Sequence, residues 1–232
     1  MQSLIEIMTP IFLYMHIGAG LVALILFWVP IFSRKGGINH RRSGRCYVNA
    51  MWAVVITAIL LSIKNIYTAH YLSAAFLGFL ALITMRPLWS GISILENKHE
   101  ISCRHKVTDQ VLLISIVIFG GTLIVVARLM PEHSLSNVVL VFGVLGVANI
   151  FELSKSFKSV TETNWLGSHI SALCVTGIAS HTAFLVFGAS SIIGQVFTSY
   201  WAMLPWFLPT VVGLIGIAVA KRRFLSRQQV KL

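Results

Sequence analysis

The stretch MTPIFLYMHIGAGLVALILFWVPIF, residues 8–32, contains no charged residue and decides the fold class. A transmembrane helix needs roughly 20 consecutive apolar residues, so this run can cross a bilayer. The segment before it, MQSLIEIM, lacks the basic region that begins a signal peptide. The run is also too long for the apolar part of such a peptide. We therefore expect the first helix to remain in the protein.

Six further apolar runs of about spanning length follow along the chain. They cover residues 47–66, 72–94, 108–128, 137–153, 165–187 and 203–220. Hydrophobic residues make up 56% of the chain and charged residues 11%, whereas soluble domains carry about 25% charged residues. The sequence predicts an all-α polytopic membrane helical bundle of seven transmembrane helices, forming one domain over residues 1–232. The sixth run is rich in small residues, which predicts a central place in the bundle.

Lysine and arginine residues lie mainly in every second segment between the predicted spans, so most of them fall on one side of the membrane. One side carries Arg34, Lys35, Arg41, Arg42, Arg45, Lys98, Arg104, Lys106, Lys155, Lys158, Lys221, Arg222, Arg223, Arg227 and Lys231, and the other carries Lys64 and Arg128. Basic loops face the cytoplasm, so we expect the C-terminus inside and the N-terminus outside. The net charge of +11 lies in short loops, which favours anionic lipid headgroups as partners and argues against nucleic acid. We expect a multi-pass protein of the cell inner membrane.

Two histidines fall within predicted spans at matching depth. His16 and His181 each lie about five residues from the middle of their spans, roughly 7 Å toward the outside. Histidines at one level on two helices are the arrangement that holds a b-type haem between helices, with each imidazole as an axial ligand. This pair favours haem b and electron transfer. Alternatively, each imidazole hydrogen-bonds a carbonyl or hydroxyl group in a packed interior.

Three more histidines lie near the expected cytoplasmic boundary, namely His40, His105 and His169. Three imidazoles suit zinc or another transition metal with one open coordination position. Asp109 and Glu152 are acidic candidates near the same boundary. No local spacing such as His-x-x-x-His supports this site. The alternative is that His40 and His105 are loop residues among basic neighbours.

Arg86 is the charged residue placed least favourably for a membrane protein. It lies near the middle of the third run, where a cation costs several kcal/mol unless it is paired or hydrated. Pro87 follows it, and we expect this proline to break or kink the helix. Glu152, an anionic substrate or a cofactor propionate would each neutralise Arg86. The alternative is that its side chain extends toward the cytoplasmic face.

A motif before the second run, HRRSGRCY at residues 40–47, links the chain to a known family. Further motifs are RHK (104–106), HI (169–170), TAF (182–184) and LPW (204–206). With these and His16, the chain resembles a bacterial multipass membrane protein family of unknown function. It departs from that family at Val107 and Thr108, where an aromatic and an aliphatic residue are expected. The resemblance implies the topology and no established activity.

Four functions remain open from the residues alone. The first is a membrane protein that binds a haem or metal cofactor through intramembrane histidines for electron transfer, with haem b held by His16 and His181. The second is a transporter or small-ligand binding protein with Arg86 in a polar interior. The third is an intramembrane metal-dependent hydrolase, and the fourth is a membrane partner subunit with structural histidines. Helix seven has no lysine within its apolar run, which argues against a retinal protein.

Overall fold

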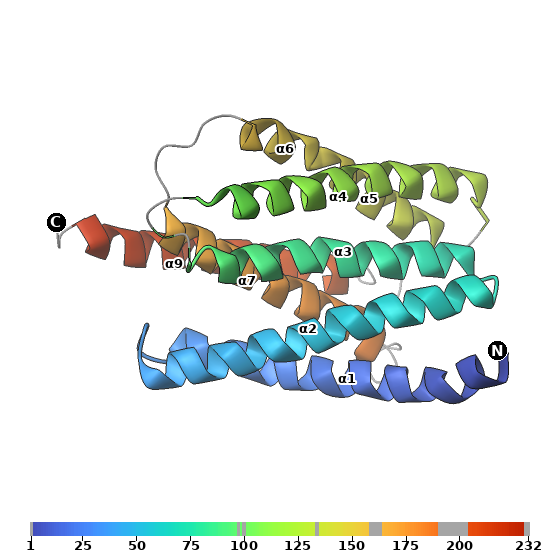
Figure 1. Ribbon diagram of the computed structural model, residues 1–232, viewed down its shortest axis with the longest axis horizontal. Coiled ribbons are helices and arrows are strands. Elements are labelled where there is room, and N and C mark those ends of the chain that lie inside the picture. Colours follow the sequence, from blue (N-terminus) through green and yellow to red (C-terminus); the bar gives the residue numbers. More distant parts are fainter. Residues whose placement is uncertain are drawn as a thin grey trace.

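The computed structural model describes residues 2–96, 98, 101–132, 135–157, 164–189 and 204–229, with side chains between residues 8 and 225. All of the regular structure in these residues is helical. The helices are α1 (Gln2–Phe32), α2 (Ile38–Tyr67), α3 (Tyr71–Ser93), α4 (Cys103–Leu129), α5 (Ser136–Ala148), α6 (Ile150–Ser156), α7 (Trp165–Ala183), the π-helical turn η1 (Phe184–Gly188) and α9 (Leu204–Gln229). They form an elongated bundle with the two chain termini at opposite ends (Figure 1).

Seven of these segments are long and apolar enough to cross a membrane, as the sequence predicted. Helices α5 and α6 together make one span, and α7 with η1 makes another. Their outer surfaces expose many large aliphatic and aromatic side chains, for example Ile25, Ile118 and Val219. Such a surface is stable only against lipid, so the protein is a polytopic integral membrane protein.

Helices α2 and α4 each begin in polar and basic residues, earlier than the apolar runs indicated. Helix α2 begins at Ile38, so the basic motif at residues 40–47 is helical rather than a loop. The chain turns at Gly36, whose φ of 74° is a left-handed conformation that favours glycine. Helix α4 begins at Cys103, because the side chain of Ser102 accepts a hydrogen bond from the backbone N–H of His105. We call the end of the bundle that carries the C-terminus the basic end. The first turns of α2 and α4 both lie there.

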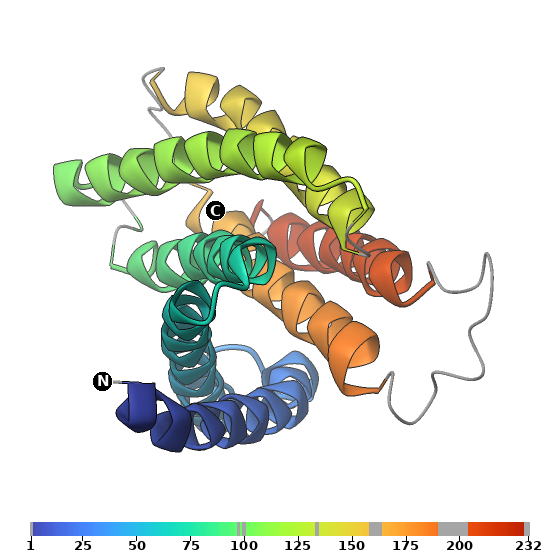
Figure 2. The same cartoon turned by 90° about the vertical axis from the view of Figure 1, so that its right-hand side faces the viewer.

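The core follows α3, which lies between α2 on one side and α4 on the other (Figures 1 and 2). One cluster of buried side chains joins α1, α2 and α3 around Met51, Val55 and Leu88. A second joins α3, α4 and α5 around Phe79 and Leu123. The two clusters share α3, α7 packs on α3 and α9 packs on α7, so the seven spans form one continuous body.

Helix α7 is not the most buried helix, and the expectation that it is central was wrong. Helices α2 and α3 bury a larger share of their surface than α7 does. The small residues of α7 act at particular contacts instead. A β-carbon on Gly177 would lie 2.1 Å from the ring of Phe27, so this glycine lets α1 approach α7.

Candidate functional site

Arg86 bridges two carboxylates that come from two other helices. Its Nε lies 2.9 Å from Asp109 Oδ1, and its Nη2 lies 3.2 Å from Asp109 Oδ2. Its Nη1 lies 2.6 Å from Glu152 Oε2. We call these three residues the charge triad, which joins α3, α4 and α6. Between described residues, the structure contains two ion pairs, and both belong to this triad. The guanidinium donates in a fork geometry that suits a carboxylate.

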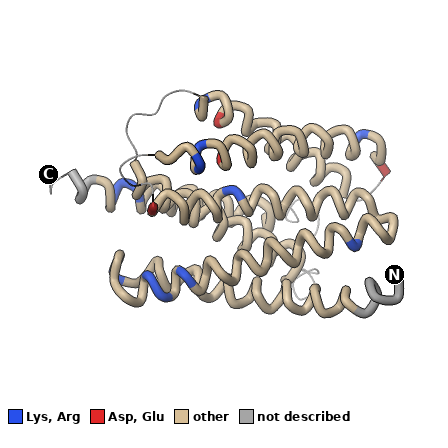
Figure 3. Tube along the Cα trace, in the orientation of Figure 1, with Lys and Arg blue, Asp and Glu red and all other residues tan. Residues whose placement is uncertain are grey.

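The charge triad lies between the middle of the bundle and its basic end. Arg86 is seven residues before the end of α3, which is about 10 Å along the helix. Figure 3 shows that most Lys and Arg residues of the described chain gather at this end. The side chains of Arg86 and Asp109 are 21% and 17% exposed, whereas that of Glu152 is 60% exposed. Glu152 is therefore the member of the triad whose side chain is most accessible from outside the bundle.

Pro87 does not end α3, which continues as a helix to Ser93. The expected break after Arg86 is therefore absent. Proline removes one backbone donor from a helix, but packing on both sides can hold the helix together. Here Leu88 is fully buried in the cluster with α1 and α2, which fixes the backbone beside Pro87.

A break in a span occurs elsewhere, between α5 and α6 at Asn149. The amide of Asn149 donates to the carbonyl of Leu145 at 2.8 Å, within its own helix. The short helix α6 then carries Glu152 to the charge triad. No feature of the sequence predicts this break, because residues 137–153 form one apolar run without proline.

His105 lies next to the charge triad on α4. It is buried, and its Nδ1 lies 2.8 Å from Ser93 Oγ at the end of α3. Its ring stacks on Trp89, with ring centroids 4.9 Å apart. Asp109 follows one helical turn later, so the two side chains share one face of α4. His105 thus extends the polar contact between α3 and α4 from Asp109 to the end of the helices.

The three histidines proposed as metal ligands contact separate partners. Nδ1 of His169 lies 2.7 Å from the carbonyl oxygen of Gly91, and Nδ1 of His40 lies 3.0 Å from that of Pro30. His105 is bonded to Ser93 instead. Among the described residues, no three His, Cys, Asp or Glu side chains gather as a metal site. Similar depth placed the three histidines near one boundary, but they lie on α2, α4 and α7 and face different neighbours.

His16 and His181 are not brought together either. Nδ1 of His16 lies 3.0 Å from Thr57 Oγ1 and 3.2 Å from the carbonyl oxygen of Val54, both on α2. His181 accepts a hydrogen bond at Nε2 from Trp28 Nε1 at 3.2 Å, and its Nδ1 lies 2.7 Å from the carbonyl oxygen of Gly177.

The two histidines meet α1 at different levels. Trp28 is about three helical turns beyond His16 on α1. Equal distance from the middle of a run did not predict a shared level, although the two spans, Met8–Phe32 and Trp165–Gly188, have nearly the same length. The imidazoles face separate partners, so this arrangement does not fit a haem held between them.

A buried hydroxyl pair escaped the sequence analysis. Tyr47 Oη lies 2.7 Å from Thr176 Oγ1, between α2 and α7. Thr176 Oγ1 also donates to the carbonyl of Leu173 at 2.8 Å, so the Tyr47 hydroxyl is the donor in the pair. Tyr47 and Thr176 are 2% and 0% exposed. Neither residue type marks a site by itself, which is why sequence reasoning passed over them.

No known family model, curated protein or solved structure matches this chain. The resemblance to a multipass family therefore remains a prediction, and the functional argument is based on the geometry above.

Proposed function

We propose that this protein is a proton-coupled transporter of a small solute, and that the charge triad is its proton-exchange site. The supporting observation is that Arg86, Asp109 and Glu152 join three membrane-spanning segments through charged groups. Ionisable residues within spans are rare because they are energetically unfavourable there, and they often mark ion or substrate pathways.

The charge balance of the triad supports proton exchange. Two carboxylates face one guanidinium, so the fully ionised triad carries one excess negative charge. A proton on Glu152 would neutralise that excess and leave Arg86 paired with Asp109. Glu152 has the most exposed side chain of the three and lies four residues before the end of its span, which puts it within reach of water at the basic end. The proton would weaken the bond between Glu152 and Arg86 and so loosen α6 from α3.

The break at Asn149 supports movement of α6 as a unit. Discontinuous membrane helices form the substrate and ion sites of many transporters, because a short segment can move separately from the rest of its span. Helix α6 contains seven residues and has no buried residue. Among the described residues, two side-chain bonds connect α6 to the bundle, namely the bond from Arg86 to Glu152 and the bond from Gln110 Nε2 to the carbonyl oxygen of Ser156 at 3.2 Å.

Infrared difference spectroscopy of the purified full chain tests the exchange site without knowledge of the solute. Acidification protonates carboxylates throughout the chain, so the wild-type spectrum contains the C=O bands of several carboxylic acids. We expect Glu152→Gln to lose a component whose frequency differs from that of an exposed carboxyl group, because the Glu152 carboxyl lies beside the guanidinium of Arg86. Glu132→Gln, at an exposed carboxylate between α4 and α5, is the control and should keep that component. A component that Glu152→Gln keeps at wild-type intensity would overturn the assignment of the triad.

Proteoliposomes that enclose a pH-sensitive dye test the transport itself. A panel of amino acids, sugars and organic anions would be added outside, and proton movement would be recorded. We expect one solute class to drive proton movement in the wild type and in Glu132→Gln but not in Asp109→Asn. Proton movement that Asp109→Asn leaves at the wild-type rate would remove the triad from the transport cycle.

The haem hypothesis has one observation in its favour. Nδ1 of both His16 and His181 bonds a backbone carbonyl, and a ligating imidazole often makes this bond to fix its orientation. However, Nε2 of His181 is engaged by Trp28. An absorption spectrum of the same purified sample decides the matter: a Soret band that shifts on reduction supports haem, and its loss in His181→Ala would assign the ligand. We also propose that the basic end of the bundle faces the cytoplasm.

A further inference from the structure

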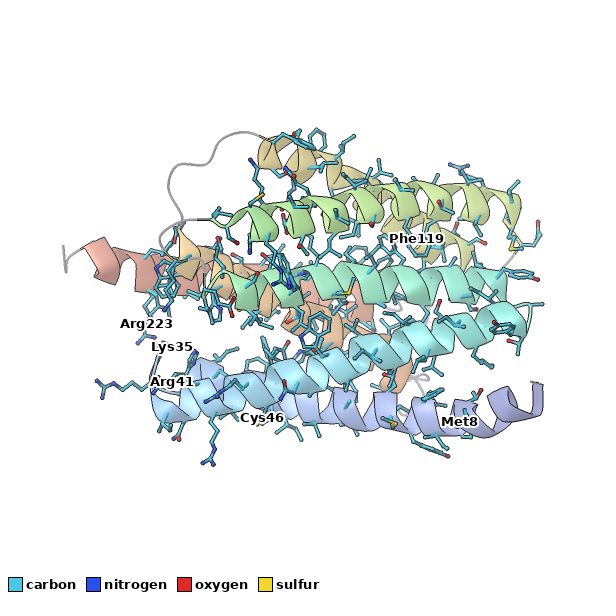
Figure 4. All side chains as sticks on the ribbon, in the orientation of Figure 1. Met8, Lys35, Arg41, Cys46, Phe119 and Arg223 are labelled. Atoms are coloured by element: carbon cyan, nitrogen blue, oxygen red, sulfur yellow. The ribbon has the colours of Figure 1, made fainter. Side chains whose placement is uncertain are left out.

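Two cations at the basic end share one aromatic ring. Lys35 lies in the turn between α1 and α2, and Arg223 lies near the end of α9. Lys35 Nζ is 5.5 Å from the centre of the Phe224 ring, and the guanidinium carbon of Arg223 is 5.8 Å from it. Figure 4 shows Lys35 and Arg223 next to each other at this end of the bundle. Segments almost 190 residues apart in sequence thus bring two positive charges together.

Lys35 is held in place by the end of α1. Its Nζ donates to the carbonyl oxygens of Pro30 at 2.8 Å and Ile31 at 2.7 Å. An ammonium group has three N–H donors, so one remains for a further partner. Partial burial lowers the pKa of Lys35, the neighbouring Cys174 raises it in part, and the nearby charge of Arg223 lowers it. An anion beside both groups would relieve the repulsion between them.

The described residues supply no such anion. The ion pairs within the described part of the chain are those of Arg86, and no carboxylate pairs with Lys35 or Arg223 there. Phe224 contributes a ring face that stabilises both cations but does not neutralise them. Two cations held together without a counter-charge indicate a ligand that carries negative charge on several oxygens.

We infer that Lys35 and Arg223 bind a phosphate group, carried either by an anionic lipid headgroup or by a soluble phosphate compound. A phosphate has enough acceptor oxygens to take the third donor of Lys35 and the fork of Arg223 together. The site lies where α1 and α9 end, and paired basic residues at the ends of spans recognise lipid phosphates. A bound phosphate would connect α9 to the α1–α2 turn.

Thermal unfolding of the full chain in a neutral maltoside detergent tests the site. The probes are phosphatidylglycerol, phosphatidylcholine and sodium phosphate, each titrated at constant ionic strength. We expect phosphatidylglycerol or phosphate to raise the Tm in a saturable manner. Lys35→Gln and Arg223→Gln should each raise the half-saturating concentration about tenfold, because each removes a charge-assisted hydrogen bond.

Arg42→Gln is the matched control, because Arg42 is an exposed cation at the same end of the bundle. It removes the same charge and should leave the half-saturating concentration unchanged. Saturation with phosphatidylglycerol but not with sodium phosphate identifies the lipid as the source, and the reverse identifies a soluble compound. Equal titrations of Arg223→Gln and Arg42→Gln would overturn the proposal, as would a Tm that none of the probes raises.

Lys35→Gln also removes two hydrogen bonds to α1, so its stability without ligand must be compared with the wild type. Arg223→Gln removes no such bond in the described structure, and it tests the site if Lys35→Gln is unstable. This inference is independent of the proposed transport, because neither residue contacts the charge triad.

Discussion

Arg86 is a cation inside a membrane-spanning helix, and its environment explains how the bundle tolerates it. Asp109 takes two of its donors and Glu152 a third. The sequence offered Glu152 as one of three alternative partners of Arg86, and the ion pair confirms that alternative. It offered Asp109 only as an acidic candidate near the metal site, because the depth of a residue in a run does not reveal which way its side chain faces. A carboxylate on the neighbouring span at a similar depth is the signal that would have identified this partner.

The three members of the charge triad should differ in their effect on stability. Arg86→Gln leaves two carboxylates without a cation, and we expect it to lower the free energy of unfolding by about 3 kcal/mol, the low end of the range for a broken buried pair, because the pair is partly exposed. Asp109→Asn removes one oxygen of the two-point, more buried contact and should rank second. Glu152→Gln leaves a balanced pair and should have the smallest effect. Thermal unfolding in detergent ranks the three variants by their loss of stability. If Glu152→Gln lost as much stability as Arg86→Gln, the argument from the charge balance of the triad would be contradicted.

The pair formed by Tyr47 and Thr176 predicts an asymmetry between two substitutions. Thr176→Val leaves the buried Tyr47 hydroxyl without an acceptor, and we expect a loss of about 1–3 kcal/mol. Tyr47→Phe removes that hydroxyl, while Thr176 keeps its bond to Leu173, so the loss should be about 1 kcal/mol.

A double-mutant cycle measured by thermal unfolding checks the coupling within this pair. The variant with both substitutions should lose less than the sum of the single losses, because it leaves no buried hydroxyl without a partner. Strictly additive losses would show that the hydroxyl pair does not stabilise the contact of α2 with α7.

At the scale of elements, the contact of α4 with α5 depends on glycines. A β-carbon on Gly120 would lie 2.8 Å from Gly146 Cα and 2.9 Å from the carbonyl oxygen of Gly143. These neighbours are backbone atoms, which cannot move aside as a flexible side chain can. The two helices therefore approach closely enough for the ring of Phe79 to pack against Gly146 from α3. Small residues allow this kind of contact between membrane helices.

Gly120→Ala should separate α4 from α5 and lower the free energy of unfolding by about 1–3 kcal/mol. The neighbouring Gly121→Ala is a matched control, because nothing lies within 4 Å of its β-carbon. It should stabilise the protein by up to about 1 kcal/mol, since alanine favours a helix more than glycine does. The midpoints of thermal unfolding compare the two, and equal midpoints would contradict the close contact of these helices.

The existence of each span was predictable from the sequence, but its ends and irregularities were not. Apolar run length predicted all seven spans, because the bilayer imposes a minimum length on each. The runs missed the first turns of α2 and α4, where basic and polar residues are helical outside the apolar segment. They also missed the break at Asn149, which depends on packing and not on a proline.

At the scale of the whole molecule, the distribution of charge follows the long axis of the bundle. The basic residues of the described chain gather at the end of the bundle that holds the C-terminus, and the N-terminus lies at the other end (Figures 1 and 3). The sequence predicted this grouping from alternate loops. It did not predict which polar side chains would meet, because helices that share a boundary still turn different faces to their neighbours. Of the predicted site residues, Arg86 and Glu152 meet, whereas His16 and His181 take separate partners.

The direction of insertion can be tested at the two ends of α4. Cys103 is exposed at its first turn, and Glu132 is exposed just beyond its last turn. A variant that keeps Cys103 as its single cysteine should react with a membrane-impermeant maleimide only after the cells are permeabilised, because basic ends of spans stay in the cytoplasm. Glu132→Cys, in a background without the three native cysteines, should react in intact cells. The opposite pattern would reverse the orientation and place Arg223 outside, and labelling of both positions from one side would show that α4 does not cross the membrane.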